Sequence, residues 1–321
     1  MNDLSYLQYT NVIIDNFVNK VLEDGGTVDE VLLRNEYNNL HTINKKQSTL
    51  TMIGGAYKAT KLYGMNPQTS ALIPFTFSRT GVATRVNRDG LLETVPADTP
   101  RMDYDPVTKK FKGLLMEKGG ANLLARSEEF DNAVWAKSNS SVTANTISAP
   151  DGSNTADKLV ENTASGQEHF ISQARDSVTT PETVTFSVYA KAGERTWIGL
   201  QLSNNINSSV HVYFDLIAGV KGSLITGADY SGASAEIIPA GNGWYRCSLA
   251  ATKGNTVNTI NRPTIHIRTG NNSAQYTGDG VSGIYIWGAQ LETSTYPTSY
   301  IPTAGTSVSR GNEFCNMAIG S

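Results

Sequence analysis

The histidines and the paired carboxylates are the residues of this chain whose types could support catalysis or bind a metal ion. The four histidines stand at positions 41, 169, 211 and 266, on separate segments and without the spacing of metal ligands. Two carboxylate pairs have the groups that glycoside hydrolysis needs, Asp103 with Asp105 and Glu128 with Glu129. Adjacent acids on loops are normally solvated, and no nucleophile motif or phosphate-binding glycine loop accompanies them. We therefore expect no enzyme, no catalytic residue and no metal centre.

Aromatic and polar side chains alternate with aliphatic ones in several later segments. In residues 196–202, Ile198, Leu200 and Leu202 occupy alternate positions and share one buried face of a strand. The side chains that the same parity argument turns outward are Trp197, Gln201, Tyr189, His211, Tyr213, His266 and Arg268. If their strands share a sheet, its outer face offers rings that stack on sugars and groups that hydrogen-bond hydroxyls. The pattern indicates a glycan-binding face, and the alternative is that a loop, an upstream segment or a neighbouring subunit covers it.

The elements that must position these side chains are short strands separated by turn residues. Strands are predicted at residues 169–174, 184–192, 196–203, 209–216, 235–239, 244–250, 264–269 and 283–292. Gly241, Asn242 and Gly243 predict a tight hairpin turn between two of them. Strands do not alternate with helices, so a β-sandwich or jelly roll is expected over residues 118–310. A jelly roll could hold a structural calcium ion, but no loop has the ligand pattern, so no cofactor is predicted.

The chain before the sandwich divides into two parts. Residues 1–48 predict two helices, and their apolar stripes are expected to mediate oligomerisation or attachment through Leu7, Ile14, Val18, Val21, Leu33, Tyr37 and Leu40. Residues 49–117 lose the helical period and predict an extended, β-rich connector with a turn at residues 87–90. Residues 311–321 are expected to form a C-terminal tail. The overall prediction is a mainly β protein with a helical N-terminal segment.

Composition excludes several classes of partner. Charged residues make up 17% of the 321 residues and the net charge is −3, so no basic surface for nucleic acid is expected. No apolar run is long enough to span a bilayer, and no secretory signal is evident. Cys247 and Cys315 form no metal-ligand pattern and are predicted to be reduced, the first in a core and the second in the tail.

Several motifs occur in an order that composition does not explain. They include FTFSRTGVATRVNRDGLLETVPADTPRMDY at residues 75–104, GLLMEKGGANLLARSEEFDNAVWAK at 113–137 and YIWGAQLETSTYPTSYIPT at 285–303. With these motifs, residues 56 to about 310 resemble the bacteriophage head spike or head fibre structural proteins, which carry a carbohydrate-binding-like jelly roll. The first fifty residues lie outside the resemblance.

The resemblance implies a non-enzymatic virion protein, made in the bacterial cytoplasm and displayed on the virion surface, where it contacts other virion proteins and glycans of the host or its surroundings. Fibres in general suggest a homotrimer, while a two-helix anchor would equally suit a dimer. Attachment to the capsid and attachment to the tail are both open. The rival interpretations are a soluble glycan-binding module without a virion role and a polysaccharide-degrading tail enzyme.

Overall fold

The computed structural model describes residues 51–58, 61–65, 72–175, 177–178, 181–204, 208–254, 259–260 and 262–317. Every regular element in these residues is a β-strand, and the mainly β prediction is confirmed. The two predicted N-terminal helices and their apolar positions from Leu7 to Leu40 lie outside the described residues. No helix long and apolar enough to cross a membrane is present in the part of the chain that the structure describes.

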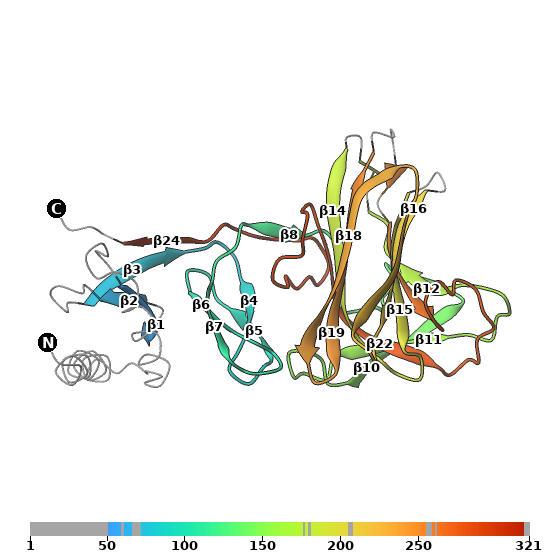
Figure 1. Ribbon diagram of the computed structural model, residues 1–321, viewed down its shortest axis with the longest axis horizontal. Helices are drawn as coiled ribbons and strands as arrows, with labels where there is room; N and C mark the ends of the chain where they lie inside the picture. The colour runs from blue at the N-terminus through green and yellow to red at the C-terminus, as the bar shows by residue number, and fades with distance from the viewer. Residues whose placement is uncertain are drawn as a thin grey trace, which may run out of the picture.

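Two six-stranded antiparallel sheets form a β-sandwich, at the right of Figure 1. The junction sheet has the order β10 (Ser140–Ile147), β11 (Ala156–Glu161), β22 (Gly283–Glu292), β14 (Glu182–Lys191), β19 (Trp244–Lys253), β18 (Tyr230–Gly241). The distal sheet has the order β17 (Val220–Thr226), β16 (Ser209–Asp215), β15 (Trp197–Ser203), β21 (Arg262–Arg268), β12 (His169–Ser172), β9 (Ala136–Ser138). A short pair, β13 (Ser177–Val178) with β20 (Thr259–Ile260), accompanies them.

The order of the strands is that of a jelly roll. Lettered B to I along the chain, β11, β12, β14, β15, β16, β19, β21 and β22 form a B-I-D-G sheet and a C-H-E-F sheet. Asn242 and Gly243, both at positive φ, make the predicted two-residue turn between β18 and β19. Four strands of the two six-stranded sheets were not predicted: β9, β10, β11 and β17. Three of these, β9, β10 and β17, have no fully buried position, because they are outermost in their sheets.

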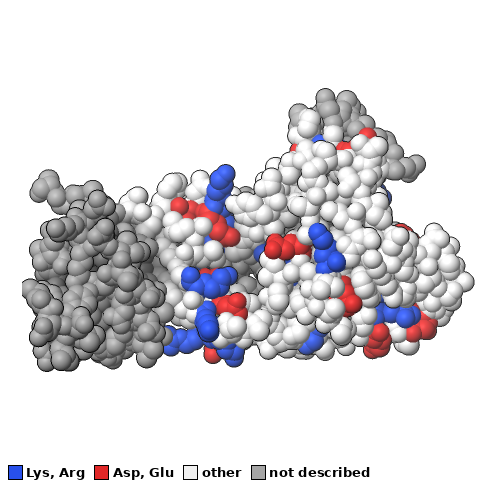
Figure 2. Space-filling view, viewed as in Figure 1, with Lys and Arg blue, Asp and Glu red and all other residues white. Residues whose placement is uncertain are grey.

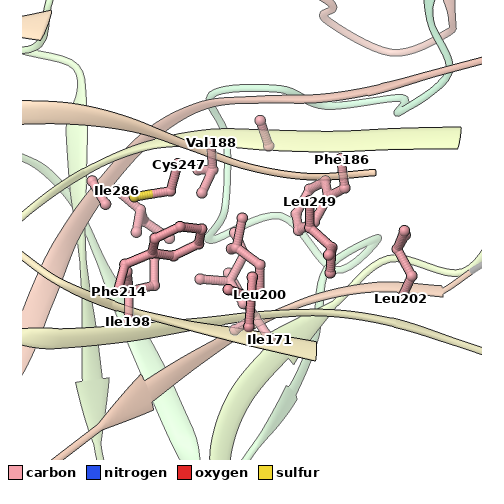
Figure 3. Packing of buried hydrophobic residues seen from close by; sticks show 14 of the residues in the cluster. Ile171, Phe186, Val188, Ile198, Leu200, Leu202, Phe214, Cys247, Leu249 and Ile286 are labelled. Carbon is pink, nitrogen blue, oxygen red and sulfur yellow. The ribbon is translucent and has the colours of Figure 1, made fainter. Parts of the chain in front are cut away.

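The core lies between the two sheets. Figure 3 shows Val188, Cys247 and Ile286 of the junction sheet facing Ile198 and Phe214 of the distal sheet, all with 0% exposure. Inward residues occupy every second position, which is the alternation that the sequence showed. Cys247 is in this core as predicted, and burial raises the pKa of its thiol.

Two β-hairpins of the connector lie beside the junction sheet (Figure 1). They are β4 (Ala83–Val86) with β5 (Leu92–Val95), and β6 (Arg101–Tyr104) with β7 (Phe111–Leu115). The predicted turn between β4 and β5 is present, where the Asn87 Oδ1 accepts hydrogen bonds from the Asp89 and Leu91 N–H groups at 2.9 and 3.0 Å. The connector is therefore an ordered layer and not a bare linker.

The segments on either side of the sandwich pair with each other. β8 (Gly120–Asn122) pairs with β23 (Val308–Arg310), and a four-stranded sheet has the order β1 (Thr51–Lys58), β2 (Lys61–Met65), β3 (Leu72–Ser78), β24 (Phe314–Met317). Residues 311–321 are thus not simply a tail, because Phe314–Met317 is a strand hydrogen-bonded to β3. This sheet lies at the end of the molecule opposite the distal sheet (Figure 1).

A buried cluster of charges, the arginine–glutamate cluster, holds these segments together. It comprises Arg79, Arg101, Glu117, Arg310 and Glu313. The Glu313 carboxylate accepts hydrogen bonds from Arg79 Nη1 at 2.9 Å and from Arg101 Nε and Nη2 at 2.7 Å. Glu117 accepts from Arg101 Nη2 at 2.9 Å and from Arg310 Nη1 at 2.8 Å. The side chains of the three arginines and of Glu313 have 0% exposure, so each charge depends on its partners for solvation.

Replacing Glu313 with Ala should shift chemical unfolding strongly, because Arg79 and Arg101 would keep buried charges without their shared carboxylate. Removing one partner of a buried pair costs about 3–5 kcal/mol. Guanidinium unfolding followed by circular dichroism measures this loss. Glu93→Ala is the control, since its pair with Arg85 is part-exposed at 38% and 21% and should contribute below about 1 kcal/mol. Equal, small shifts in both variants would contradict a structural role for the cluster.

Candidate functional site

The register of three central strands of the distal sheet gathers six of the seven sequence-predicted residues on its outer face. Trp197 lies between Asp215 and Arg268, and Gln201 lies between His211 and Thr264. In the row between them, Gly199 is flanked by Tyr213 and His266. We call this surface the distal face. It belongs to the sheet that points away from the connector (Figure 1).

Tyr189 is the exception, and its placement beside Trp197 was wrong. It lies on β14 of the junction sheet, where it is 5% exposed and packs against Trp287 and Tyr300 at ring-centre distances of 5.5 and 6.1 Å. The Arg246 guanidinium lies 5.4 Å from the centre of its ring. Parity assigns a side chain to a face of its own sheet, but it does not say which sheet the strand joins. Tyr189 therefore lies on the outer face of the junction sheet, which is the side of the sandwich next to the connector.

Three of the six residues on the distal face are buried. Tyr213, His266 and Arg268 are only 2%, 1% and 3% exposed. The Arg268 guanidinium lies 5.4 Å from the Tyr213 ring centre, donates to the Ala274 carbonyl at 2.5 Å and pairs with Glu168 at 3.2 Å. The loop after β21 thus lies against this part of the face. Coverage by a loop was one of the alternatives to an open glycan-binding surface. These three residues support the face and are not its accessible part.

Trp197, Gln201 and His211 remain partly exposed. The indole lies on Gly222 of β17, where an added Cβ would stand 3.0 Å from Trp197 Cζ3 and 2.4 Å from Asn271 Oδ1. The Gln201 Oε1 accepts a hydrogen bond from His266 Nε2 at 2.9 Å. The accessible part of the distal face is therefore an aromatic ring next to neutral hydrogen-bonding side chains.

Both histidines of the distal face are biased toward their neutral form. Burial lowers the pKa of His266 well below its ordinary value, and the nearby Arg268 and His211 lower it further. Burial and Arg268 also lower the pKa of His211, while Glu168 opposes the shift. A neutral imidazole offers one donor and one acceptor, which suits hydroxyl groups better than it suits anions.

The carboxylates considered for catalysis each hold a local structure. Asp105 Oδ1 accepts hydrogen bonds from the N–H groups of Val107 and Thr108 at 3.0 and 2.7 Å in the turn after β6. Glu128 accepts one from the Tyr300 hydroxyl at 2.8 Å, and burial raises the pKa of its carboxyl. Among the described residues, no group of three or more His, Cys, Asp or Glu side chains is placed to hold a metal ion.

Two loop residues beside the distal face, Glu168 and Asn271, were not predicted from the sequence. Glu168 pairs with Arg268, and Asn271 Oδ1 accepts a hydrogen bond from the Ser223 N–H at 2.8 Å next to Trp197. Strand parity applies only inside strands, so residues that reach a face from a loop leave no periodic signal.

Comparison with known proteins finds a likeness only among solved structures. No protein-family model matches the chain, and no curated protein sequence does. Among solved structures, "CBM35 from Cellvibrio japonicus Abf62" matches with a TM-score of 0.26 and 11% identity, over 56% of this chain and 100% of that chain. At this TM-score the likeness carries no argument about a ligand, so the site rests on the residues described above.

The depressed histidine pKa has a consequence for stability. An unfolded His266 binds a proton below about pH 6.5, whereas the folded one resists it, so stability should fall as the pH falls below that value. His266→Gln, which cannot titrate, should show a smaller loss between pH 7 and pH 5. Urea midpoints of the wild type and the variant at the two pH values measure the difference. An identical pH dependence in both proteins would contradict the assignment.

Proposed function

We propose that this protein is a non-enzymatic display protein whose jelly roll binds carbohydrate through the distal face. The observation that carries the proposal is the partly exposed Trp197 ring beside Gln201 and His211, on the sheet that faces away from the rest of the chain. An aromatic plane takes the C–H face of a sugar, and the neighbouring amide and imidazole take its hydroxyl groups.

Charge supports a neutral ligand. In Figure 2, Lys and Arg side chains are interspersed with Asp and Glu, and they form no continuous basic area on the visible face. Within the distal face itself, the Arg268 charge is paired with Glu168, and the pKa values of the histidines are lowered. Saccharide recognition through stacking and neutral hydrogen bonds fits this balance better than binding of a polyanion does.

The virion is the setting that we propose for this display. The resemblance of residues 56 to about 310 to phage head spike and head fibre proteins supports it, and so does the elongated arrangement with the jelly roll at one end (Figure 1). The four-stranded sheet of β1, β2, β3 and β24 is at the opposite end, where a base that contacts capsid or tail proteins would be (Figure 1). In this proposal the protein is a homotrimer on the virion surface. Its partners are virion proteins and host or environmental glycans.

Replacing Trp197 with Ala should weaken glycan binding at least about tenfold, equivalent to about 1.4 kcal/mol, because the stacking surface is lost. The ring is partly exposed, so the thermal unfolding midpoint should change little. A glycan array followed by calorimetry on the best ligand provides the measurement. Tyr296→Ala, which removes a 53% exposed ring outside the sandwich, is the control and should bind as the wild type does. A strongly destabilised Trp197→Ala protein would instead place the ring in the core.

The oligomeric state tests the fibre role separately. A homotrimer of 34.6 kDa chains should scatter light as a particle of about 104 kDa, three times that mass, on a sizing column. Mass spectrometry of purified phage particles should also detect the chain. A monomer that is absent from particles would favour the soluble glycan-binding module, and loss of polysaccharide chain length during incubation would favour the tail enzyme.

A further inference from the structure

Three turns from different parts of the chain meet where the connector joins the sandwich. They are the turn between β4 and β5, the turn between β6 and β7, and the turn between β18 and β19. Pro106 O lies only 2.6 Å from where a Cβ on Gly90 would stand and 2.8 Å from where one on Gly241 would stand. Both glycines have positive φ, so this backbone contact depends on glycine at each position. The three turns are thereby held in close contact.

A cleft of about 390 Å³ opens beside this contact. Its apolar walls come from both modules, with Pro106 and Val107 on the connector and Pro239 and Tyr245 on the sandwich. Asp89 and Lys109 stand at it as well. Among the described residues, neither the Asp89 carboxylate nor the Lys109 ammonium group has an ion-pair or hydrogen-bond partner. The cleft thus combines apolar surface with polar groups that are free to bind a ligand.

A second cleft of about 300 Å³ lies on the other side of Asn242 and Trp244, which line both. Its remaining lining residues are Ile147, Ser148, Ala149, Lys191 and Tyr285. The Lys191 ammonium group donates to the Asn242 carbonyl at 2.9 Å, and the Trp244 Nε1 donates to the Ser148 carbonyl at 3.2 Å. These bonds fix the partition between the clefts. We call the two clefts together the junction groove.

The junction groove is preformed. The connector cannot swing away from the sandwich without disturbing the arginine–glutamate cluster, in which Arg101 also donates to the Ser299 Oγ at 2.6 Å. A rigid groove loses little conformational entropy when a ligand binds. Its polar lining includes the side chains of Asp89, Lys109 and Lys191, and Tyr285 is only half-buried. An extended peptide, in contrast, usually binds by pairing with a row of unpaired backbone N–H and C=O groups at a sheet edge.

We propose that the junction groove binds an extended oligosaccharide that passes over Asn242 and occupies both clefts. Tyr285 provides a ring surface in the second cleft, and Pro106, Val107 and Pro239 provide apolar surface in the first. Asp89, Lys109 and Lys191 provide groups for sugar hydroxyls. The site is separate from the distal face. It takes a chain of several sugars, whereas the distal face offers one partly exposed indole ring.

Two blocking variants test the proposal on the full chain. Val107→Trp fills the first cleft and Ser148→Trp fills the second, and both positions are exposed, at 59% for Val107, so folding should be preserved. Lys110→Trp is the matched control, because Lys110 is exposed in the same turn but does not line the groove. The probes are cellohexaose, xylohexaose, maltohexaose and chitohexaose with their disaccharides, titrated by calorimetry.

At least one hexasaccharide should bind at least about tenfold more tightly than its disaccharide. Each blocking variant should weaken the binding of that hexasaccharide at least about tenfold. Lys110→Trp and Trp197→Ala should retain it. Unchanged binding in both blocking variants, or no binding of any hexasaccharide, would overturn the proposal. Loss of binding in Trp197→Ala alone would support the distal face and refute the junction groove, so the two proposals fail in different ways.

Discussion

The arginine–glutamate cluster is the interaction on which the arrangement of the whole chain depends. Three guanidinium groups and the Glu313 carboxylate are taken out of water, and Glu117 is 16% exposed. Buried charges are tolerated only when their partners are in place. Arg79 and Arg101 come from the connector, whereas Arg310 and Glu313 follow the last strand of the sandwich. The segments before and after the jelly roll must therefore assemble together, and the pairing of β8 with β23 and of β3 with β24 extends the same association on both sides.

The same requirement explains the polar end of β22. Gln290 and Glu292 are buried, at 0% and 1% exposure, because they receive the segment that follows them. The Gln290 Oε1 accepts a hydrogen bond from the Ile301 N–H at 2.7 Å, and Glu292 accepts one from the Thr298 N–H at 2.9 Å. The side chains of β22 accept the backbone hydrogen bonds of this segment, because the proline-containing segment forms no regular ladder with a strand. The segment then supplies Ser299 to the cluster, with its N–H 2.9 Å from a Glu117 oxygen.

The sequence predicted those parts of the fold that have a local period. Alternation placed Ile198, Leu200 and Leu202 in the core, and turn chemistry located the hairpin at Asn242. It could not predict which sheet each strand joins, and Tyr189 was misplaced for that reason. Long-range pairs leave no periodic trace either: Arg79 and Glu313 are 234 positions apart, and both occur in segments that looked merely polar. The junction groove was missed because its lining residues come from turns and strands that are far apart in the sequence.

The pairing of β3 with β24 affects how the protein would respond to force. The jelly roll is joined to the four-stranded sheet through two chain segments, one entering after β3 and one returning before β24, and these run side by side (Figure 1). A pull on the distal sheet is divided between two parallel tethers. Neither can lengthen alone, because the cluster and the β8–β23 pair link them. The jelly roll would thus stay attached to the four-stranded sheet under a tension that could extend a single tether.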